Sequence, residues 1–438
     1  MKSTEERISI TAAMIGHAGD ALSRLLEFTQ PADAVLSAYF REHRVLGGRE
    51  RGFVAETCYA VLRHKRQLEK LVFPAQSPRW LVLAALLRFS GVGQRQLAEV
   101  VSAAEKDWLL EFKSRPELEF SLADQADLPD WLVEKLLTRC SADQLLELAR
   151  ALNQSAPLDL RVNSIKATRE EVLARLEAEN IAAEPCRYAP LGIRLKAKPA
   201  LQKHPLYLEG AIEVQDEGSQ LLGYLLAPKR GEMVVDFCAG AGGKTLLLGA
   251  LMRSTGRLYA FDVSNKRLAK LKPRVARSGL SNMHPICIAS ENDIRVKRLA
   301  GKIDRVLVDA PCSGLGTLRR NPDLKWRQTP QSVEELSRKQ RDILAGAARL
   351  VKPGGCLVYA TCSILSEENE AVVDAFLAAH ADFYRLSAAA VLAQQGIVID
   401  CNDASNDMRL LPQRHGTDGF YAAVLERAYP QGAPGAAK

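Results

Sequence analysis

The feature that most constrains the fold is a repeated strand-then-helix series that begins near residue 233. Short apolar runs typical of buried strands, each followed by a helical or glycine-bearing stretch, occur at residues 233–238, 257–261, 284–288, 304–308 and 356–359. Alternating β and α units predict an α/β domain with a parallel, doubly wound sheet. Ligands bind such sheets at the carboxyl ends of the strands, so the residues there are the first candidates for function.

Helical spacing dominates the first part of the chain. Apolar residues recur every three or four positions at residues 32–44, 50–71 and 78–87, and breaks fall at Gly47-Gly48 and Phe73-Pro74. We therefore predict an all-α domain at residues 1–140.

A small α+β module is expected to follow. Residues 158–162 and 192–197 alternate apolar and polar side chains like strands, and a capping box, Thr168-x-x-Glu171, opens a helical stretch between them. We place this module at residues 141–215, the α/β domain at residues 216–430 and a flexible tail at residues 431–438.

Composition is that of a cytoplasmic globular protein. Of the 438 residues, 47% are hydrophobic and 25% charged, and no apolar run approaches the roughly 20 residues that span a bilayer. The first residues contain no signal-peptide core, so we expect no membrane partner. The formal charge of +7 is uneven, because residues 1–145 hold 19 Lys and Arg against 20 Asp and Glu. The basic excess, which suits a polyanion, lies in the remainder.

A glycine-rich turn follows the first strand of the series. The pattern Asp236-x-x-x-Gly-x-Gly242 leads into an apolar helix, and Asp262 ends the next strand. A phosphate-binding P-loop would need glycine in place of Cys238, and a dinucleotide fingerprint would need a third glycine in place of Thr245. The remaining interpretation is a loop whose glycines let S-adenosylmethionine lie close to the backbone. Asp262 would then accept hydrogen bonds from the ribose hydroxyls of the cofactor. A purely structural turn is the alternative.

Two of the nine cysteines follow strand ends. Cys312 stands in Asp309-Ala-Pro-Cys-Ser-Gly, just past the fourth strand, and Cys362 stands in Tyr359-Ala-Thr-Cys-Ser, just past the fifth. Because neighbouring strand ends line one crevice, both thiols can face the same pocket. The odd cysteine count and the lack of Cys-x-x-Cys pairs argue against a disulfide framework. We expect packing or backbone roles for the others: Cys58, Cys140, Cys186, Cys238, Cys287, Cys356 and Cys401.

Two thiols in a methyltransferase indicate a pyrimidine substrate. Carbon 5 of a pyrimidine is not nucleophilic enough to attack a sulfonium methyl group, but a thiolate added to carbon 6 turns the ring into an enamine that is. A base then removes the carbon 5 proton so that the thiol can leave. An acidic group near ring nitrogen 3, for which Asp309 is placed, can stabilise the charge that develops there.

These motifs resemble the NOL/NOP/Sun family of RNA 5-methylcytosine methyltransferases. The resemblance covers roughly residues 150–427 and includes Arg319-Arg-Asn-Pro-Asp323, Lys352-Pro-Gly-Gly355 and Asp418-Gly-Phe-Tyr421. The front part, with residues 52–63, is similar to the NusB-like domain of the bacterial RsmB (Fmu, Sun) branch, which methylates small-subunit ribosomal RNA. The resemblance implies a Rossmann-like class I methyltransferase domain, a small RNA-recognition-like module and an all-α NusB-like N-terminal domain.

The resemblance also assigns roles to residues. It makes Cys362 the nucleophile and Cys312 the helper that assists proton removal and release, and it places Asp309 between cofactor and base. The family's Ala-Pro is replaced by Gly240-Ala241, which keeps the backbone path open. The implied contacts of S-adenosyl-L-methionine are Cys238, Ala239, Gly240, Ala241, Gly242, Gly243, Lys244, Asp262, Asp293 and Asp309.

Basic side chains accompany the catalytic motifs. A group soon after the Pro-Cys loop combines cations with an aromatic side chain, which suits phosphate contact and base stacking on single-stranded RNA: Arg319, Arg320, Lys325 and Trp326. A second group, at residues 266–277, has six basic residues and no acid, and a plain solvated face explains it equally well. The target base must be turned out of any stack to reach Cys362.

We therefore predict an S-adenosylmethionine-dependent RNA cytosine-5 methyltransferase that acts as a monomer, without a metal, on small-subunit (16S) ribosomal RNA. A tRNA substrate is one alternative. The other is an RNA-binding ribosome-assembly factor that keeps the fold without the activity. Retention of both strand-end thiols, Asp309 and the glycine loop argues against that factor, since a binding module has no need of them.

Overall fold

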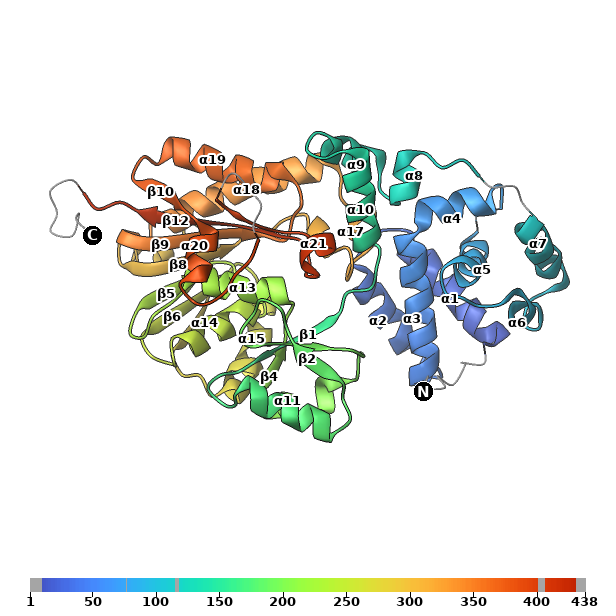
Figure 1. The fold of residues 1–438 in the computed structure, drawn as a ribbon, viewed down its shortest axis with the longest axis horizontal. Helices are drawn as coiled ribbons and strands as arrows, with labels where there is room; N and C mark the ends of the chain where they lie inside the picture. Colours follow the sequence, from blue (N-terminus) through green and yellow to red (C-terminus); the bar gives the residue numbers. More distant parts are fainter. Residues whose placement is uncertain (1–9, 76, 115–117, 401–405, 431–438) are drawn as a thin grey trace. The chain divides into compact units, whose positions relative to one another are not determined.

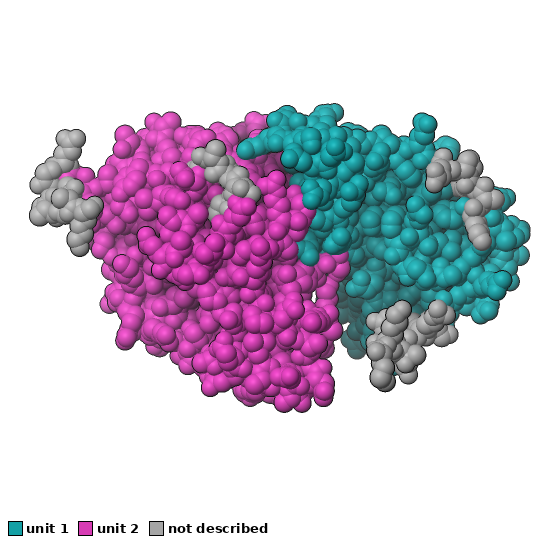
Figure 2. Space-filling model, viewed as in Figure 1, with its two compact units in different colours: residues 1–154, 318–329 teal, residues 155–317, 330–438 magenta. Residues whose placement is uncertain are grey.

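The computed structural model describes all residues except 1–9, 76, 115–117, 401–405 and 431–438. The predicted tail and Cys401 therefore lie outside the described residues. The chain forms two compact units, coloured separately in Figure 2. We call residues 1–154 with 318–329 the helical unit, and residues 155–317 with 330–438 the sheet unit.

The elements of the helical unit are helices, as the apolar spacing predicts. In chain order they are α1 (Ala12–Leu25), α2 (Ala32–Glu42), α3 (Gly48–Arg63), α4 (Lys65–Val72), α5 (Pro78–Arg88), α6 (Gln94–Ala98), α7 (Ala103–Ser114), α8 (Leu122–Ala126), α9 (Asp130–Leu137), α10 (Ala142–Leu152) and, from the later segment, α17 (Leu324–Arg327). The single helix expected at residues 50–71 is two, because the chain turns at His64. The His64 ring stacks on Phe89 with centroids 3.8 Å apart, and its Nδ1 lies 3.0 Å from Asp127 Oδ2.

The α+β module opens the sheet unit. Its antiparallel strands have the order β2-β3-β1-β4, formed by β1 (Leu158–Val162), β2 (Ala183–Pro185), β3 (Gly192–Leu195) and β4 (Ile212–Val214). Helix α11 (Arg169–Ala178) begins with the predicted capping box, in which Glu171 N donates to Thr168 Oγ1 (3.2 Å) and Thr168 N donates to Glu171 Oε2 (2.8 Å). The remaining elements of this segment are η1 (Leu201–Lys203) and α12 (Pro205–Leu208).

The large sheet has the order β10-β12-β9-β8-β5-β6-β7, with β11 beside β12. The five predicted strands are confirmed as β5 (Met233–Asp236), β6 (Arg257–Asp262), β7 (Met283–Cys287), β8 (Ile303–Asp309) and β9 (Val351–Thr361), all parallel. The expectation of a purely parallel sheet is wrong, because the chain returns antiparallel to β9 and covers its free edge. The added strands are β10 (Phe383–Leu386), β11 (Met408–Leu410) and β12 (Phe420–Arg427).

Helices cover both faces of this sheet, as Figure 1 shows. One face packs on α13 (Glu217–Leu226), α14 (Gly243–Leu251), α15 (Asn265–Ser278) and α20 (Ala388–Ala393), and the other on α18 (Pro330–Ala348) and α19 (Glu370–Ala379). Shorter elements are α16 (Ile294–Lys297), η2 (Leu315–Thr317), η3 (Ser366–Glu368) and α21 (Pro412–His415). Among the described residues, no helix has the length and apolar character needed to cross a membrane.

Candidate active site

The glycine loop joins β5 to α14 in the sheet unit. Gly240 and Gly242 have φ angles of 57° and 83°, in the left-handed region that favours glycine. A Cβ atom on Gly242 would lie 2.1 Å from Leu271 Cδ1, whereas one on Gly240 would meet nothing within 4 Å. The loop therefore packs tightly on α15 at Gly242 and leaves open space beside Gly240.

Asp262 lies against this loop, as the sequence predicts. Its Oδ2 accepts a hydrogen bond from Gly240 N (2.8 Å), and its Oδ1 accepts one from Ser264 N (2.7 Å). Carboxylate oxygens have further lone pairs, so these bonds orient Asp262 and still leave it able to accept from a ligand hydroxyl.

Asp293 has a local structural role. It caps α16, where its Oδ1 accepts from Arg295 N (2.9 Å), and its Oδ2 accepts from Ala289 N (2.8 Å) and pairs with Arg295 Nη2 (2.6 Å). The hydrogen bond from the Arg295 side chain is the main reason why the pKa of Asp293 is lowered. These contacts account for Asp293 without a cofactor.

Lys244 and Asp309 form an ion pair at the carboxyl ends of the strands. Lys244 Nζ donates to Asp309 Oδ2 at 2.6 Å and lies 5.8 Å from the centre of the Phe420 ring. Burial on its own lowers the pKa of Lys244, but the charges of Asp309 and Cys362 outweigh it and the pKa is raised. A permanent positive charge therefore stands beside both Asp309 and Cys362.

The structure brings Cys312 and Cys362 together. Their Sγ atoms are 3.3 Å apart, within hydrogen-bonding distance. The neighbouring parallel strands β8 and β9, in which Asp309 pairs with Ala360, explain this proximity. Cys312 stands three residues after the end of β8, and Cys362 directly follows the end of β9. The hydrogen bond with Cys362, then burial, and then nearby negative charge raise the pKa of Cys312 well above its usual value. Cys312 therefore keeps its proton and can donate it to the sulfur of Cys362.

One functional carboxylate, the buried side chain of Glu368, was not identified from the sequence. Glu368 accepts hydrogen bonds from Ser313 and Ser363, the residues that directly follow the two cysteines. The only sequence signal was an acidic run after Thr-Cys-Ser, Ser366-Glu-Glu-Asn369, which is ordinary at a helix start.

The residues predicted to contact RNA after the Pro-Cys loop belong to the helical unit. Lys325 is fully buried, and its Nζ donates to Arg63 O (2.7 Å) and Asn153 Oδ1 (2.8 Å). Burial lowers the pKa of Lys325 to about 7. Arg319 is only 9% exposed. The expectation that Lys325 contacts phosphate is therefore wrong, because its ammonium is used to bind the backbone of α3.

Trp326 also packs in the helical unit. Its Nε1 donates to Leu62 O (2.7 Å), and its half-buried ring lines a pocket of about 810 Å³ with Lys65, Arg66 and Lys70. These cations pair with acids within the same unit, Lys65 with Glu69, Arg66 with Asp124 and Asp130, and Lys70 with Asp124. The pocket offers aromatic surface with little free positive charge.

The second basic group, on α15, divides into two sets. Arg274 and Arg277 pair with Glu213 of β4 at 2.8 and 2.6 Å, and Arg274 Nη1 also donates to Ala241 O (2.7 Å) in the glycine loop. The remaining cations are exposed on the solvent face: Lys266, Arg267, Lys270 and Lys272. Arg274 thus supports the glycine loop through a hydrogen bond, whereas the four exposed cations form a solvated face.

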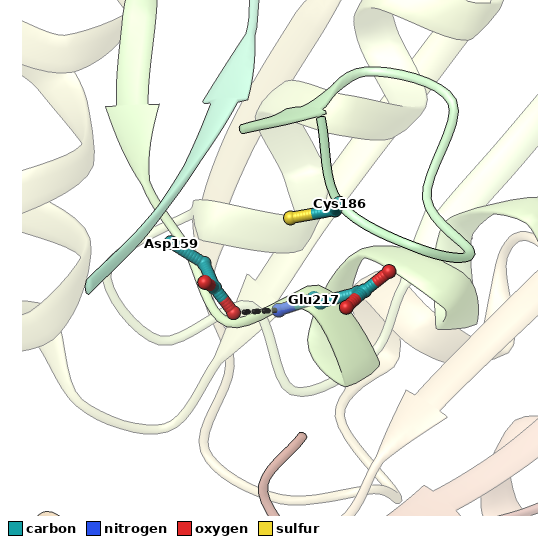
Figure 3. A group of neighbouring side chains, drawn as sticks. All are labelled: Asp159, Cys186 and Glu217. Carbon is teal, nitrogen blue, oxygen red and sulfur yellow. Dashed lines mark hydrogen bonds between the residues drawn. The ribbon is translucent and has the colours of Figure 1, made fainter. Parts of the chain in front are cut away.

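A compact cluster of two acids and a cysteine lies where the α+β module meets the start of α13. Ligand-type atoms of Asp159, Cys186 and Glu217 come within 4.8 Å of one another (Figure 3). Arg194 donates to both Asp159 oxygens (2.7 and 2.9 Å) and reaches Glu217 (3.4 Å), while Glu217 N donates to Asp159 Oδ2 (3.2 Å). Burial raises the pKa of Cys186, which favours the neutral thiol. Arg194 thus pairs with Asp159, and Glu217 accepts hydrogen bonds from Tyr188 N and Ala189 N (3.1 Å for Ala189), so these contacts explain the cluster as a structural centre.

Comparison with known proteins places this site in a family. Residues 223–426 match the family described as 16S rRNA methyltransferase RsmB/F, and residues 128–202 match the RsmF/B-like ferredoxin-like domain. The ribosomal RNA small subunit methyltransferase B of Sodalis glossinidius is 31% identical over 435 residues, 93% of this chain and 96% of that protein. The probable ribosomal RNA small subunit methyltransferase B of a Synechocystis strain is 38% identical over 313 residues, 70% and 68% of the two chains.

Solved structures agree in fold. The crystal structure of PH0851 superposes with a TM-score of 0.78 at 29% identity, covering 96% of this chain and 100% of that chain. Together with the near full-length match to the Sodalis protein, this confirms the resemblance inferred from the motifs. The chain belongs to the RsmB/F family of 16S rRNA methyltransferases and is an S-adenosylmethionine-dependent RNA methyltransferase.

Proposed function

We propose that this protein methylates carbon 5 of a cytosine in small-subunit ribosomal RNA through a covalent bond between Cys362 and carbon 6. The observation that carries the proposal is the 3.3 Å separation of the Cys312 and Cys362 sulfurs beside the Lys244–Asp309 pair. Two thiols are what carbon 5 chemistry needs, because one must attack the ring and another must help to release it. The names of the relatives from Sodalis and Synechocystis support the choice of RNA.

The glycine loop fits the cofactor. Open space beside Gly240 admits a ligand close to the backbone, and the Asp262 carboxylate at 2.8 Å from Gly240 N is suited to ribose hydroxyls. When bound, S-adenosylmethionine supplies an electrophilic methyl group. We assign its contacts to residues 238–244, Asp262 and Asp309.

Cys362 acts as the nucleophile. The Lys244 ammonium lies near the sulfur of Cys362, and the neighbouring thiol of Cys312 can donate a hydrogen bond to that sulfur. As the sulfur attacks carbon 6, negative charge spreads to ring nitrogen 3, where the Lys244 ammonium, which Asp309 holds in place, can stabilise it.

Cys312 completes the reaction after methyl transfer. The carbon 5 proton passes to the sulfur of Cys312 as the proton of Cys312 passes to the departing sulfur of Cys362. The bond between carbon 6 and Cys362 breaks, the ring double bond re-forms, and Cys312 again holds a proton. Cys362 leaves as a thiol, which must lose one proton to solvent before the next attack. The high pKa of Cys312 suits this role, since it makes the sulfur a strong base once its own proton has left.

Bisulfite sequencing of ribosomal and transfer RNA from a strain that lacks the gene tests the proposal. We expect one cytosine of the small-subunit RNA to lose its 5-methyl group and to regain it when the gene is restored. Loss of a methyl group from tRNA alone would identify a tRNA enzyme, and an unchanged map of both RNAs would favour an assembly factor without activity.

A further inference from the structure

Glu368 is a carboxylate with no access to solvent and a full set of donors. It ends η3 and has 0% exposed surface. Four hydrogen bonds converge on its two oxygens: Ser313 N (2.8 Å) and Gln340 Nε2 (3.0 Å) donate to Oε1, and the hydroxyls of Ser313 and Ser363 donate to Oε2. A buried carboxylate is costly unless its oxygens are satisfied in this way, so the site is built around it.

The donors come from the two cysteine loops. Ser313 follows Cys312, and Ser363 follows Cys362, so a single side chain holds the residues next to both thiols. The two serine hydroxyls are also 3.2 Å from each other. Gln340 of α18 strengthens the link, because its Nε2 also donates to Pro311 O (2.9 Å) in the first loop. The carboxylate is therefore the point at which the loops after β8 and β9 are joined.

The backbone of Glu368 is itself fixed. Its carbonyl accepts a hydrogen bond from the buried Tyr359 hydroxyl of β9 (2.6 Å). The next residue, Asn369, donates from Nδ2 to Ser363 O (3.0 Å) and accepts from the Thr361 hydroxyl. Glu367 O accepts from Ser337 of α18 (2.7 Å). A displacement of the Glu368 carboxylate would therefore break several of these hydrogen bonds.

We propose that Glu368 is a positioning residue that sets the separation of Cys312 and Cys362 by clamping the serine after each. The effect on catalysis rests on the proposed function. The clamp itself, which is the set of hydrogen bonds from Ser313 and Ser363 to Glu368, does not depend on that function. Glu368 is fully buried and acts through the two serines. Both sulfurs react with the same cytosine ring, so both must be placed accurately. A displacement of about 1 Å can lower the rate on the order of 10²-fold.

Two substitutions separate geometry from simple loss of a charge. In Glu368→Gln, the amide oxygen can accept from Ser313 N and Gln340, and the amide NH₂ can donate to the serine hydroxyls, which rotate to accept. Glu368→Ala removes every one of these bonds. Glu367→Gln makes the same chemical change one position earlier and serves as the control.

The first measurement is the rate at which diamide joins Cys312 and Cys362 in a disulfide, followed by mass spectrometry of the linked peptide. Diamide takes up the two electrons and two protons that the thiols lose. We expect Glu368→Ala to slow this reaction at least tenfold, an estimate on the order of the positional effect above, and Glu368→Gln and Glu367→Gln to stay within about threefold of the natural protein. If Glu368→Ala forms the disulfide as fast as the natural protein does, the proposal that Glu368 positions the two cysteines is wrong.

The second measurement is the steady-state rate of methyl transfer. Positioning predicts that Glu368→Ala lowers kcat by about 10²-fold with KM for S-adenosylmethionine within about twofold, and that Glu368→Gln restores most of kcat. An equal loss of kcat in both variants would refute positioning and assign the effect to charge. If Glu368→Ala does not fold, the double variant Ser313→Ala/Ser363→Ala removes the two hydroxyl donors and should slow disulfide formation as well.

The two proposals fail in different ways. If Cys362→Ala keeps full activity while Glu368→Ala still slows disulfide formation, the clamp stands and the proposed chemistry falls. If Cys362→Ala is inactive and Glu368→Ala forms the disulfide at the natural rate, the chemistry stands and the clamp falls.

Discussion

Cys312 and Cys362 place their sulfur atoms 3.3 Å apart, although 50 positions separate them in the sequence. The two thiols nevertheless have different surroundings. Cys362 has the Lys244 ammonium nearby, whereas Cys312 is under the influence of Glu368 and Asp309. This asymmetry predicts different outcomes when each thiol is removed.

Cys362→Ala should abolish methyl transfer and any covalent RNA adduct, because the neighbouring Cys312 keeps its proton and does not replace the lost nucleophile. Activity is measured with tritiated S-adenosylmethionine and small-subunit RNA, and the adduct by a denaturing gel. Cys356→Ala, which changes a thiol within β9, is the control and should remain active. An adduct that survives in Cys362→Ala would reverse the assignment of the two cysteines.

Cys312→Ala should leave an adduct that persists in denaturing gels. Without Cys312 the carbon 5 proton has no acceptor, so the bond between Cys362 and carbon 6 forms but does not break. Turnover should fall by a factor on the order of 10²–10⁴, the usual contribution of a proton-transfer group. Rapid release of RNA by this variant would remove the basis for the helper role.

Lys244→Met should lower kcat about 10²-fold, the scale of removing one preorganised charged donor. The variant removes the ammonium that pairs with Asp309, and the rate is measured with tritiated S-adenosylmethionine and small-subunit RNA. The control is Lys302→Met, an exposed lysine just before β8, at the opposite end of the strand from Asp309. A kcat in Lys244→Met equal to that of the natural protein would show that the Lys244 charge is not needed for catalysis.

Gly242→Ala should weaken cofactor binding and lower the free energy of unfolding. Its φ of 83° costs an alanine about 1–2 kcal/mol, and the clash 2.1 Å from Leu271 Cδ1 adds about 1–3 kcal/mol. Gly231→Ala is a matched control, since its φ is 82° and its Cβ would meet nothing within 4 Å. Calorimetry with S-adenosylmethionine measures binding, and urea titration measures stability. Equal losses in both variants would show that the contact with α15 is unimportant.

Lys325→Met should remove a pH dependence of stability. The pKa of Lys325 is about 7 in the folded chain and roughly 10.4 when unfolded, so between these values the unfolded state holds a proton that the folded state lacks. The free energy of unfolding should therefore rise with pH from 7 to 10, by up to about 1.4 kcal/mol per pH unit.

Tryptophan fluorescence is a specific probe of this effect. All four tryptophans, Trp80, Trp108, Trp131 and Trp326, belong to the helical unit. Urea midpoints across this pH range should depend less on pH in Lys325→Met than in the natural protein or in Lys302→Met. The same slope in all three proteins would show that Lys325 does not carry the effect.

Much of the site could be predicted because its residues follow the ends of strands. Apolar runs located β5 to β9, and the rule for parallel sheets then predicted that the residues after β8 and β9 would meet. That reasoning brought together Asp309, Cys312 and Cys362 without knowledge of any long-range contact. Asp262 could be placed beside the glycine loop for the same reason, because it ends β6, the strand next to β5.

Contacts that depend on distant partners could not be predicted in this way. Lys325 and Trp326 have the composition of an RNA-binding surface, and only the contacts with Arg63 and Leu62 show that they are packing residues. Glu368 is similar, because a glutamate after a strand is unremarkable until two serines and a glutamine are found on its oxygens. In both cases the chemical environment is made by partners that sequence spacing does not identify.

The helical unit is a composite of two separated stretches of the gene. Its second stretch, residues 318–329, supplies Lys325, Trp326 and Asp323, and Asp323 accepts a hydrogen bond from Ala32 N (3.3 Å). Exchange of the first 154 residues alone, by recombination or by design, would leave a buried lysine and an indole without their backbone acceptors. The two stretches must therefore be inherited as a pair, and grafting a different N-terminal region onto this enzyme requires carrying over a dozen residues from beyond its cysteine motif.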